Sequence, residues 1–279
     1  MLASLLALAS APCYGSADFV AGLKSRTIPA LTVTVVSQAA GAAFTAGIVV
    51  VRWEKVPAPR FVALGVLTGI AALVGIWSLY RALAIGPMGI VAPIAAMSVI
   101  APVAVGFTQG ERPGRASIFG IVACIVGIML VSRARDTHGG RVSRPALMLS
   151  LVAAVSLGGV SVGFDAASAA DPYWAVAVCR ATMVVLLLFA FAPAQRSLDL
   201  PPGRDIRTLA GMGVLNESGN LLFSVASTLG PLMLVSVLST VYPVVTTILA
   251  RVVLGERLSR WQLTGTGAVL VGIACITLA

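Results

Sequence analysis

Charged side chains are scarce in this sequence of 279 residues, because only 10% of them are Asp, Glu, Lys or Arg while 58% are hydrophobic. A soluble protein carries about 25% charged residues, most of them on its surface. The composition and the mean hydropathy of +1.01 therefore exclude a soluble globule. They predict an integral membrane protein whose outer surface faces lipid.

Residues for catalysis and metal binding are also few. The chain has one His and four widely spaced Cys, which excludes a zinc knuckle, a redox Cys-x-x-Cys pair and a disulfide framework. It has no Walker phosphate-binding loop, and no serine stands in a strained Gly-x-Ser-x-Gly turn. We therefore expect neither an enzyme nor an ATP-driven pump, and no metal or cofactor.

The net charge of +9 is spread over the loops, at two to four basic residues in each. A nucleic-acid-binding protein would gather these charges into one stripe. The spacing instead favours attraction of the loops to anionic lipid headgroups.

Ten segments are apolar enough to cross a bilayer, which requires about 20 apolar residues in a helix. They cover residues 2–23, 30–51, 61–83, 89–109, 116–132, 145–164, 174–192, 206–228, 232–254 and 261–278. The sequence thus predicts an all-α integral membrane protein with about ten transmembrane helices.

The two halves of the chain resemble each other. A shift of 144 residues aligns Gly69 with Gly213, and a shift of 145 aligns Gly110-Glu111-Arg112 with Gly255-Glu256-Arg257. We therefore predict one repeat over residues 1–132, a polar linker over 133–144 and a second repeat over 145–279. Five spans in each half is an odd number, so the second repeat enters the membrane from the opposite side. Such inverted repeats are typical of secondary transporters.

Several of these features together resemble one family. Ten spans, a Gly-Glu-Arg sequence closing the fourth span of each half, and Tyr14-Gly15-Ser16 in the first span resemble the drug/metabolite transporter superfamily, EamA type. Arg180 resembles an Arg often found in the second helix of a repeat. The resemblance implies transport without ATP, mainly export, of a small metabolite, amino acid or drug through a bacterial plasma membrane. The first repeat departs from it, with Ser37-Gln38 at the position equivalent to Arg180.

Polar side chains interrupt the eighth span. Glu217, Asn220 and Ser224 share one helix face, and Asn216 lies beside them. A charged side chain rarely persists facing hydrocarbon, so this face points into the protein. We predict a site for the substrate or for a proton here. The alternative is a polar cluster that holds helices together.

Arg180 is the second charge predicted to lie within a span. It binds an anionic group of the substrate, pairs with Glu217, or extends to the membrane interface. Without a cationic partner, a buried Glu217 could load and release a proton as access alternates. Paired with Arg180, it would instead stay ionised as a structural counter-charge.

Aromatic residues are candidates for lining a substrate cavity. Trp77 and Tyr80 share one face of the third span, Tyr14 lies in the first span and Tyr242 in the ninth. Aromatic rings offer apolar area and can hold a cation, although ordinary helix packing explains them equally well.

Two further carboxylates are candidate gates. Asp18 and Asp165 lie toward the ends of the first and sixth spans, where an aspartate can also be simply hydrated. Proline residues in the fourth and ninth spans should kink their helices and could act as hinges. They are Pro93, Pro102 and Pro243.

The expected partners are a small-molecule substrate, the lipid bilayer and protons as the coupling ion, for a monomer or homodimer. Two other functions also fit: a membrane binding or scaffold protein without transport, and a channel or lipid scramblase. Loops after the even-numbered spans hold five basic residues and the opposite loops eleven, which favours both termini outside. The family resemblance implies both termini inside.

Overall fold

The fold is known from a computed structural model, which describes residues 1–24, 27–85, 91, 94–95, 97–131, 143–191, 202–255 and 259–278. All regular structure in these residues is helical. The helices are α1 (Leu2–Lys24), α2 (Ala30–Arg52), α3 (Pro59–Ile85), η1 (Met97–Val99), α5 (Ile100–Thr108), α6 (Arg115–Val131), α7 (Arg144–Ser168), α8 (Pro172–Phe191), α9 (Gly203–Leu229), α10 (Leu232–Ser239), α11 (Tyr242–Leu254) and α12 (Arg260–Thr277). Each of the ten predicted spans contains helix, which confirms the all-α fold.

Helices satisfy their backbone polar groups internally except at their ends, as the hydrocarbon core of a bilayer requires. Five segments of the described chain are long and apolar enough to cross a membrane by composition alone. They are Thr32–Arg52, Pro59–Leu79, Arg144–Ser168, Pro172–Phe189 and Leu232–Leu254. The polar stripe on α9 keeps that helix out of this set.

The ninth span is broken rather than kinked. It consists of α10 and α11, with Thr240 and Val241 between them. Pro243 has no backbone N–H, so the carbonyl four residues before it receives no helical hydrogen bond. The Thr240 backbone N–H and hydroxyl both donate to the Ser236 carbonyl, at 3.0 and 2.7 Å, which closes the end of α10. Of the other predicted hinges, Pro102 lies in the first turn of α5, and Pro93 lies outside the described residues.

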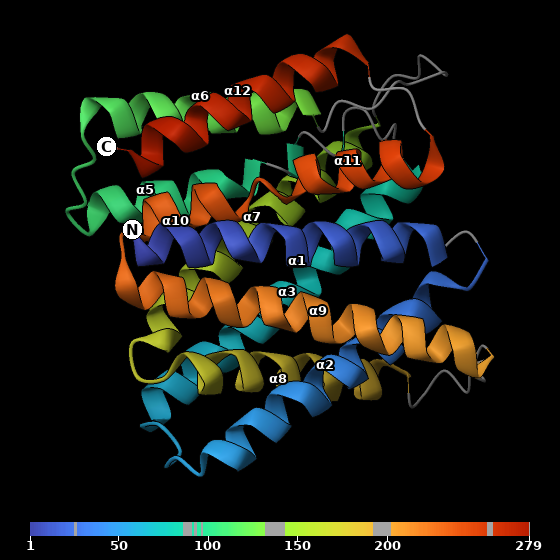
Figure 1. Cartoon of the computed structure of the whole chain (residues 1–279). Coiled ribbons are helices and arrows are strands. Elements are labelled where there is room, and N and C mark those ends of the chain that lie inside the picture. Colours follow the sequence, from blue (N-terminus) through green and yellow to red (C-terminus); the bar gives the residue numbers. More distant parts are fainter. Residues whose placement is uncertain are drawn as a thin grey trace.

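The last helices of the two halves, α6 and α12, lie side by side along one edge of the bundle (Figure 1). Gly120 meets Gly272 and Gly127 meets Gly265, so closely that a Cβ at any of them would lie 2.7 Å from the partner's carbonyl oxygen. From Gly120 to Gly127 the chain advances seven residues along α6, while the contacting residue on α12 moves back seven, from Gly272 to Gly265. The two helices are therefore antiparallel. An inverted repeat requires this direction.

Other aligned glycines make equivalent contacts in the two halves. Gly219 on α9 packs against the ring of Tyr14 on α1, and Gly75 on α3 packs against Leu157 on α7. A shift of 143 or 144 residues converts one contact into the other. Each repeat therefore packs its first helix on the third helix of the other repeat. As a result α1 lies between α9 and the α10–α11 pair (Figure 1).

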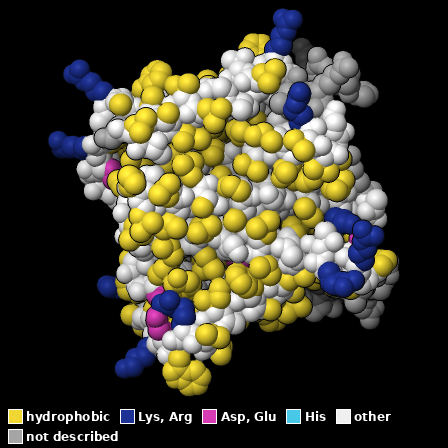
Figure 2. All heavy atoms as spheres, viewed as in Figure 1, with side chains coloured by type: hydrophobic (Ala, Val, Ile, Leu, Met, Phe, Trp, Pro, Cys, Tyr) yellow, Lys and Arg dark blue, Asp and Glu magenta, His cyan; other side chains and the backbone are white. Residues whose placement is uncertain are grey.

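Apolar side chains cover the outside of the molecule. Leu67, Val155, Phe189 and Val252 are more than 60% exposed, and Figure 2 shows hydrophobic side chains across the viewed face with Lys and Arg around its edges. Large exposed apolar surfaces mark contact with a membrane or a partner. The band of hydrophobic side chains fits the lipid-facing surface predicted from composition.

Glu111, from the Gly-Glu-Arg sequence of the first repeat, caps a helix of the second repeat. Its two carboxylate oxygens accept hydrogen bonds from the backbone N–H groups of Leu232 and Met233, at 2.6 and 3.0 Å. These are the first residues of α10, whose N–H groups have no partner within the helix. A negative charge is also favourable at a helix N-terminus.

We expect Glu111→Gln to lower the free energy of unfolding by about 1–2 kcal/mol, because the variant loses the charge and one of the two acceptors. Thermal unfolding of the purified protein in detergent measures the change. Glu54→Gln is the matched control, since Glu54 forms only an exposed ion pair with Arg52. Equal destabilisation of the two variants would show that the cap contributes nothing specific.

Candidate functional site

The polar stripe of α9 faces the interior of the bundle. Glu217, Asn220 and Ser224 are 1%, 8% and 0% exposed, and Asn216 is half-buried beside them. Glu217 lies near the middle of α9, far from either end of the helix. A carboxylate at this depth needs a counter-charge or a proton.

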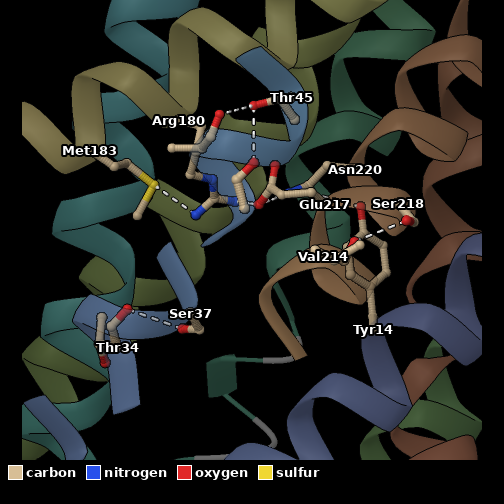
Figure 3. A network of polar contacts seen from close by, with 12 residues as sticks. Tyr14, Thr34, Ser37, Thr45, Arg180, Met183, Val214, Glu217, Ser218 and Asn220 are labelled. Carbon is tan, nitrogen blue, oxygen red and sulfur yellow. Dashed lines mark hydrogen bonds and ion pairs between the residues drawn. The ribbon is translucent and has the colours of Figure 1, made fainter. Parts of the chain in front are cut away.

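Arg180 on α8 supplies the counter-charge. Its Nη2 forms an ion pair with Oε1 of Glu217, and both side chains are at most 5% exposed. Figure 3 shows Glu217 between Arg180 and Asn220. Arg180 also donates from Nη1 to the sulfur of Met183, at 3.5 Å. Of the three alternatives for Arg180, pairing with Glu217 is the arrangement that the structure adopts.

A chain of hydrogen bonds extends from the ion pair to the first helix. Asn220 donates from Nδ2 to Oε1 of Glu217 at 3.2 Å, and the Tyr14 hydroxyl donates to Oδ1 of Asn220 at 2.9 Å. The amide of Asn220 thus uses its donor on one side and its acceptor on the other. The chain links α8 and α9 of the second repeat to α1 of the first repeat.

Small residues allow α2 to approach the ion pair closely. A Cβ at Gly41 would lie 2.7 Å from Cγ of Glu217, and Gly213 packs directly on the backbone of Ser37. The pair therefore lies where both repeats meet. Within the described residues, Nε of Arg180, Oε2 of Glu217 and the Ser224 hydroxyl are buried without a hydrogen-bond partner.

Two of the predicted aromatic residues lie beside this network and one lies away from it. The rings of Tyr14 and Tyr242 pack edge to face, with centroids 6.1 Å apart and planes at 68°. Trp77 on α3 is 62% exposed, and no described contact joins it to the ion pair. The side chain of Tyr80 lies outside the described residues.

The structure does not bring the two predicted gate residues together. Asp18 on α1 is exposed and interacts electrostatically with Tyr242. Asp165 on α7 is half-buried within hydrogen-bonding reach of Gln109 and Ser227, near Glu111. Asp165 thus lies beside the cap of α10, whereas Asp18 lies beside the tyrosine pair.

Comparison with known proteins places this arrangement in a family. The sequence model of the EamA-like transporter family matches residues 1–133 and again residues 144–278. The chain belongs to the EamA-like transporter family. It is therefore a membrane transporter of the drug/metabolite transporter superfamily, as the sequence motifs predict.

The fold of this EamA-like transporter also occurs among solved structures. One crystal structure superposes with a TM-score of 0.81 at 18% sequence identity, over 99% of this chain and 98% of the other. Such a distant likeness shows the fold alone. No curated protein matches the chain in sequence.

The sequence did not point to Met183 or Gly41 as contributors to the transporter's site, and it singled out Ser37 only as the equivalent of Arg180, not for the contact that its backbone makes with Gly213. Met183 lies one helical turn after Arg180, so helical spacing gave a usable signal. Gly41 and Ser37 lie on α2, and only the packing of α2 on α9 reveals their role. Among the described residues, no three His, Cys, Asp or Glu side chains gather to hold a metal ion.

Proposed function

We propose that this transporter is a gradient-driven exporter of a small organic molecule in a bacterial plasma membrane, with protons as the coupling ion. The buried Arg180–Glu217 pair carries the proposal. A buried ion pair gives little stability compared with apolar residues of the same volume, which favours a functional role for it. Charged residues within membrane spans commonly belong to substrate or proton pathways.

The ion pair supports a simple coupling scheme. While Arg180 contacts Glu217, the carboxylate stays ionised and the guanidinium is occupied. A movement that separates α8 from α9 leaves each charge without a partner in a water-poor site, which is costly. Glu217 then takes up a proton, and the planar guanidinium of Arg180 binds an anionic group of the substrate.

Counterflow in proteoliposomes tests the transport function. Vesicles holding the purified protein are preloaded with one compound of a metabolite panel, and entry of the labelled compound is followed. A transporter gives saturable, transient accumulation. Absence of flux for every compound would favour a scaffold protein, and flux that never saturates would favour a channel or scramblase.

For the coupling residue, we expect Glu217→Gln to abolish uptake driven by a pH gradient while substrate exchange at equal pH survives. Only the driven reaction needs a proton to load and unload. Where the single variant, which leaves Arg180 unpaired, yields too little folded protein, the Arg180→Gln/Glu217→Gln double variant is used only to look for remaining gradient-driven uptake, because it also lacks the guanidinium that the scheme assigns to the substrate. Gradient-driven uptake in a folded variant without Glu217 would eliminate this residue as the proton carrier.

A further inference from the structure

Asp18 is an acidic residue within an apolar helix, and its charge is not balanced by the described part of the protein. It lies inside α1, is exposed, and makes no ion pair or hydrogen bond within the described residues. A carboxylate at this position rarely faces hydrocarbon. Its exposed surface therefore opens toward water or a ligand.

Two cations on the helices near this part of the protein are paired with other carboxylates. Lys24, at the end of α1, contacts Asp205 at 2.6 Å, and Arg180 pairs with Glu217. The helices packed on α1 bring three uncharged polar side chains to this side of it, Tyr242 and Thr246 of α11 and Asn220 of α9. Arg251 lies in the last turn of α11 and forms no described ion pair with Asp18.

Two aromatic rings lie near Asp18. Tyr14 precedes it by one helical turn on the same face of α1. Tyr242 packs edge to face on Tyr14 and interacts electrostatically with Asp18. Both rings are only half-buried. With centroids 6.1 Å apart, both can lie within the roughly 6 Å over which a ring attracts a cation.

The rings are held in place. The Tyr14 hydroxyl donates to Asn220, and the Thr246 hydroxyl of α11 donates to the Gly15 carbonyl of α1 at 3.0 Å. A Cβ at Gly15 would lie 2.7 Å from the Tyr242 carbonyl oxygen, so only glycine permits this approach of the two helices. A site held in this way loses little entropy when a ligand binds.

We propose that Asp18, Tyr14 and Tyr242 form a binding site for an organic ammonium group. One carboxylate and two rings match a bulky monovalent cation, which is weakly hydrated and needs few oxygen ligands. A divalent metal ion needs several oxygen ligands, and no three acidic, His or Cys residues of the described chain lie together. The inference names a substrate class for the proposed transporter and rests on that function.

Calorimetry on the protein in lipid nanodiscs tests the site with two probes of the same shape. Choline carries the ammonium charge, and 3,3-dimethylbutan-1-ol is its neutral carbon analogue. We expect choline to bind and the neutral analogue not to bind. Asp18→Asn should weaken choline binding at least roughly tenfold, as expected for losing one partner of a desolvated charge pair.

Asp165→Asn is the matched control, because Asp165 lies in a comparable part of the second repeat beside Gln109 and Ser227 instead of aromatic rings. It should bind choline like the original protein. Tyr242→Phe keeps a ring and should retain binding, whereas Tyr242→Leu should lose it. Each variant is first shown to be monodisperse and folded.

The site is refuted if the protein does not bind choline, if the neutral analogue binds equally well, or if Asp18→Asn binds choline unchanged. Binding is measured without flux, so loss of the site and loss of the transport function are distinguishable. If choline bound in a way that depends on Asp18 but the protein showed no counterflow, the ammonium site would stand and the proposed transport function would be refuted.

Discussion

Glu217→Gln lowers the free energy of unfolding by about 3–5 kcal/mol, the expected result of leaving Arg180 charged, buried and unpaired. Arg180→Met has a comparable cost, since it leaves Glu217 without its counter-charge. The Arg180→Met/Glu217→Leu double variant removes both charges and returns to within about 1 kcal/mol of the original stability. Unfolding in mixed detergent micelles measures all three.

A half-buried ion pair between the end of α1 and the start of α9 provides the comparison. Lys24 and Asp205 are each 26% exposed at their side chains, so Asp205→Asn should cost no more than about 1 kcal/mol. If the Arg180→Met/Glu217→Leu variant lost as much stability as the two single variants together, the buried charges would not interact. Single variants as stable as the original protein would show that water reaches both charges.

Gly127→Ala and Gly265→Ala each destabilise the protein by about 1–3 kcal/mol, although alanine normally favours a helix over glycine. The added Cβ of either variant would lie 2.7 Å from the carbonyl oxygen of the other glycine. A backbone atom cannot move aside as the end of a flexible side chain can. The two helices must separate, and the contacts along α6 and α12 are lost with them.

Gly267→Ala is the control. Gly267 lies on α12 like Gly265, but nothing lies within 4 Å of the position that its added Cβ would take. It should be neutral or stabilising by about 0.5–1 kcal/mol, because alanine loses less conformational entropy on folding. The thermal unfolding temperatures of the three variants test the sign of each effect. The same sign at positions 127 and 267 would contradict the close contact of α6 with α12.

The helices were predictable because a membrane allows so few alternatives. Hydropathy located each span, since an apolar stretch of this length has to satisfy its own backbone. The aligned glycines were also informative, because Gly75 and Gly219 make equivalent contacts in the two halves. What hydropathy does not give is which face of a helix meets lipid. Trp77 resembled a cavity residue by pattern and is 62% exposed in the structure.

The sequence predicted which residues form the site but not which of them contact each other. Glu217 stood out as a charge within a span, and Arg180 was open to three alternatives. The two residues are 37 positions apart, so their contact depends on how α8 and α9 turn toward each other. The break before α11 needed structure too, because Pro243 predicts a kink and the bonds of Thr240 to Ser236 convert it into a break.

The glycine contacts between α6 and α12 also bear on how the chain is made. Gly127 is synthesised 138 residues before Gly265. At about 5–20 residues per second, the ribosome needs on the order of ten seconds to cover that interval. During this time α12, whose glycines meet those of α6 in the folded protein, has not yet been made. We expect this edge to be the last part of the protein to assemble, after α12 has left the ribosome.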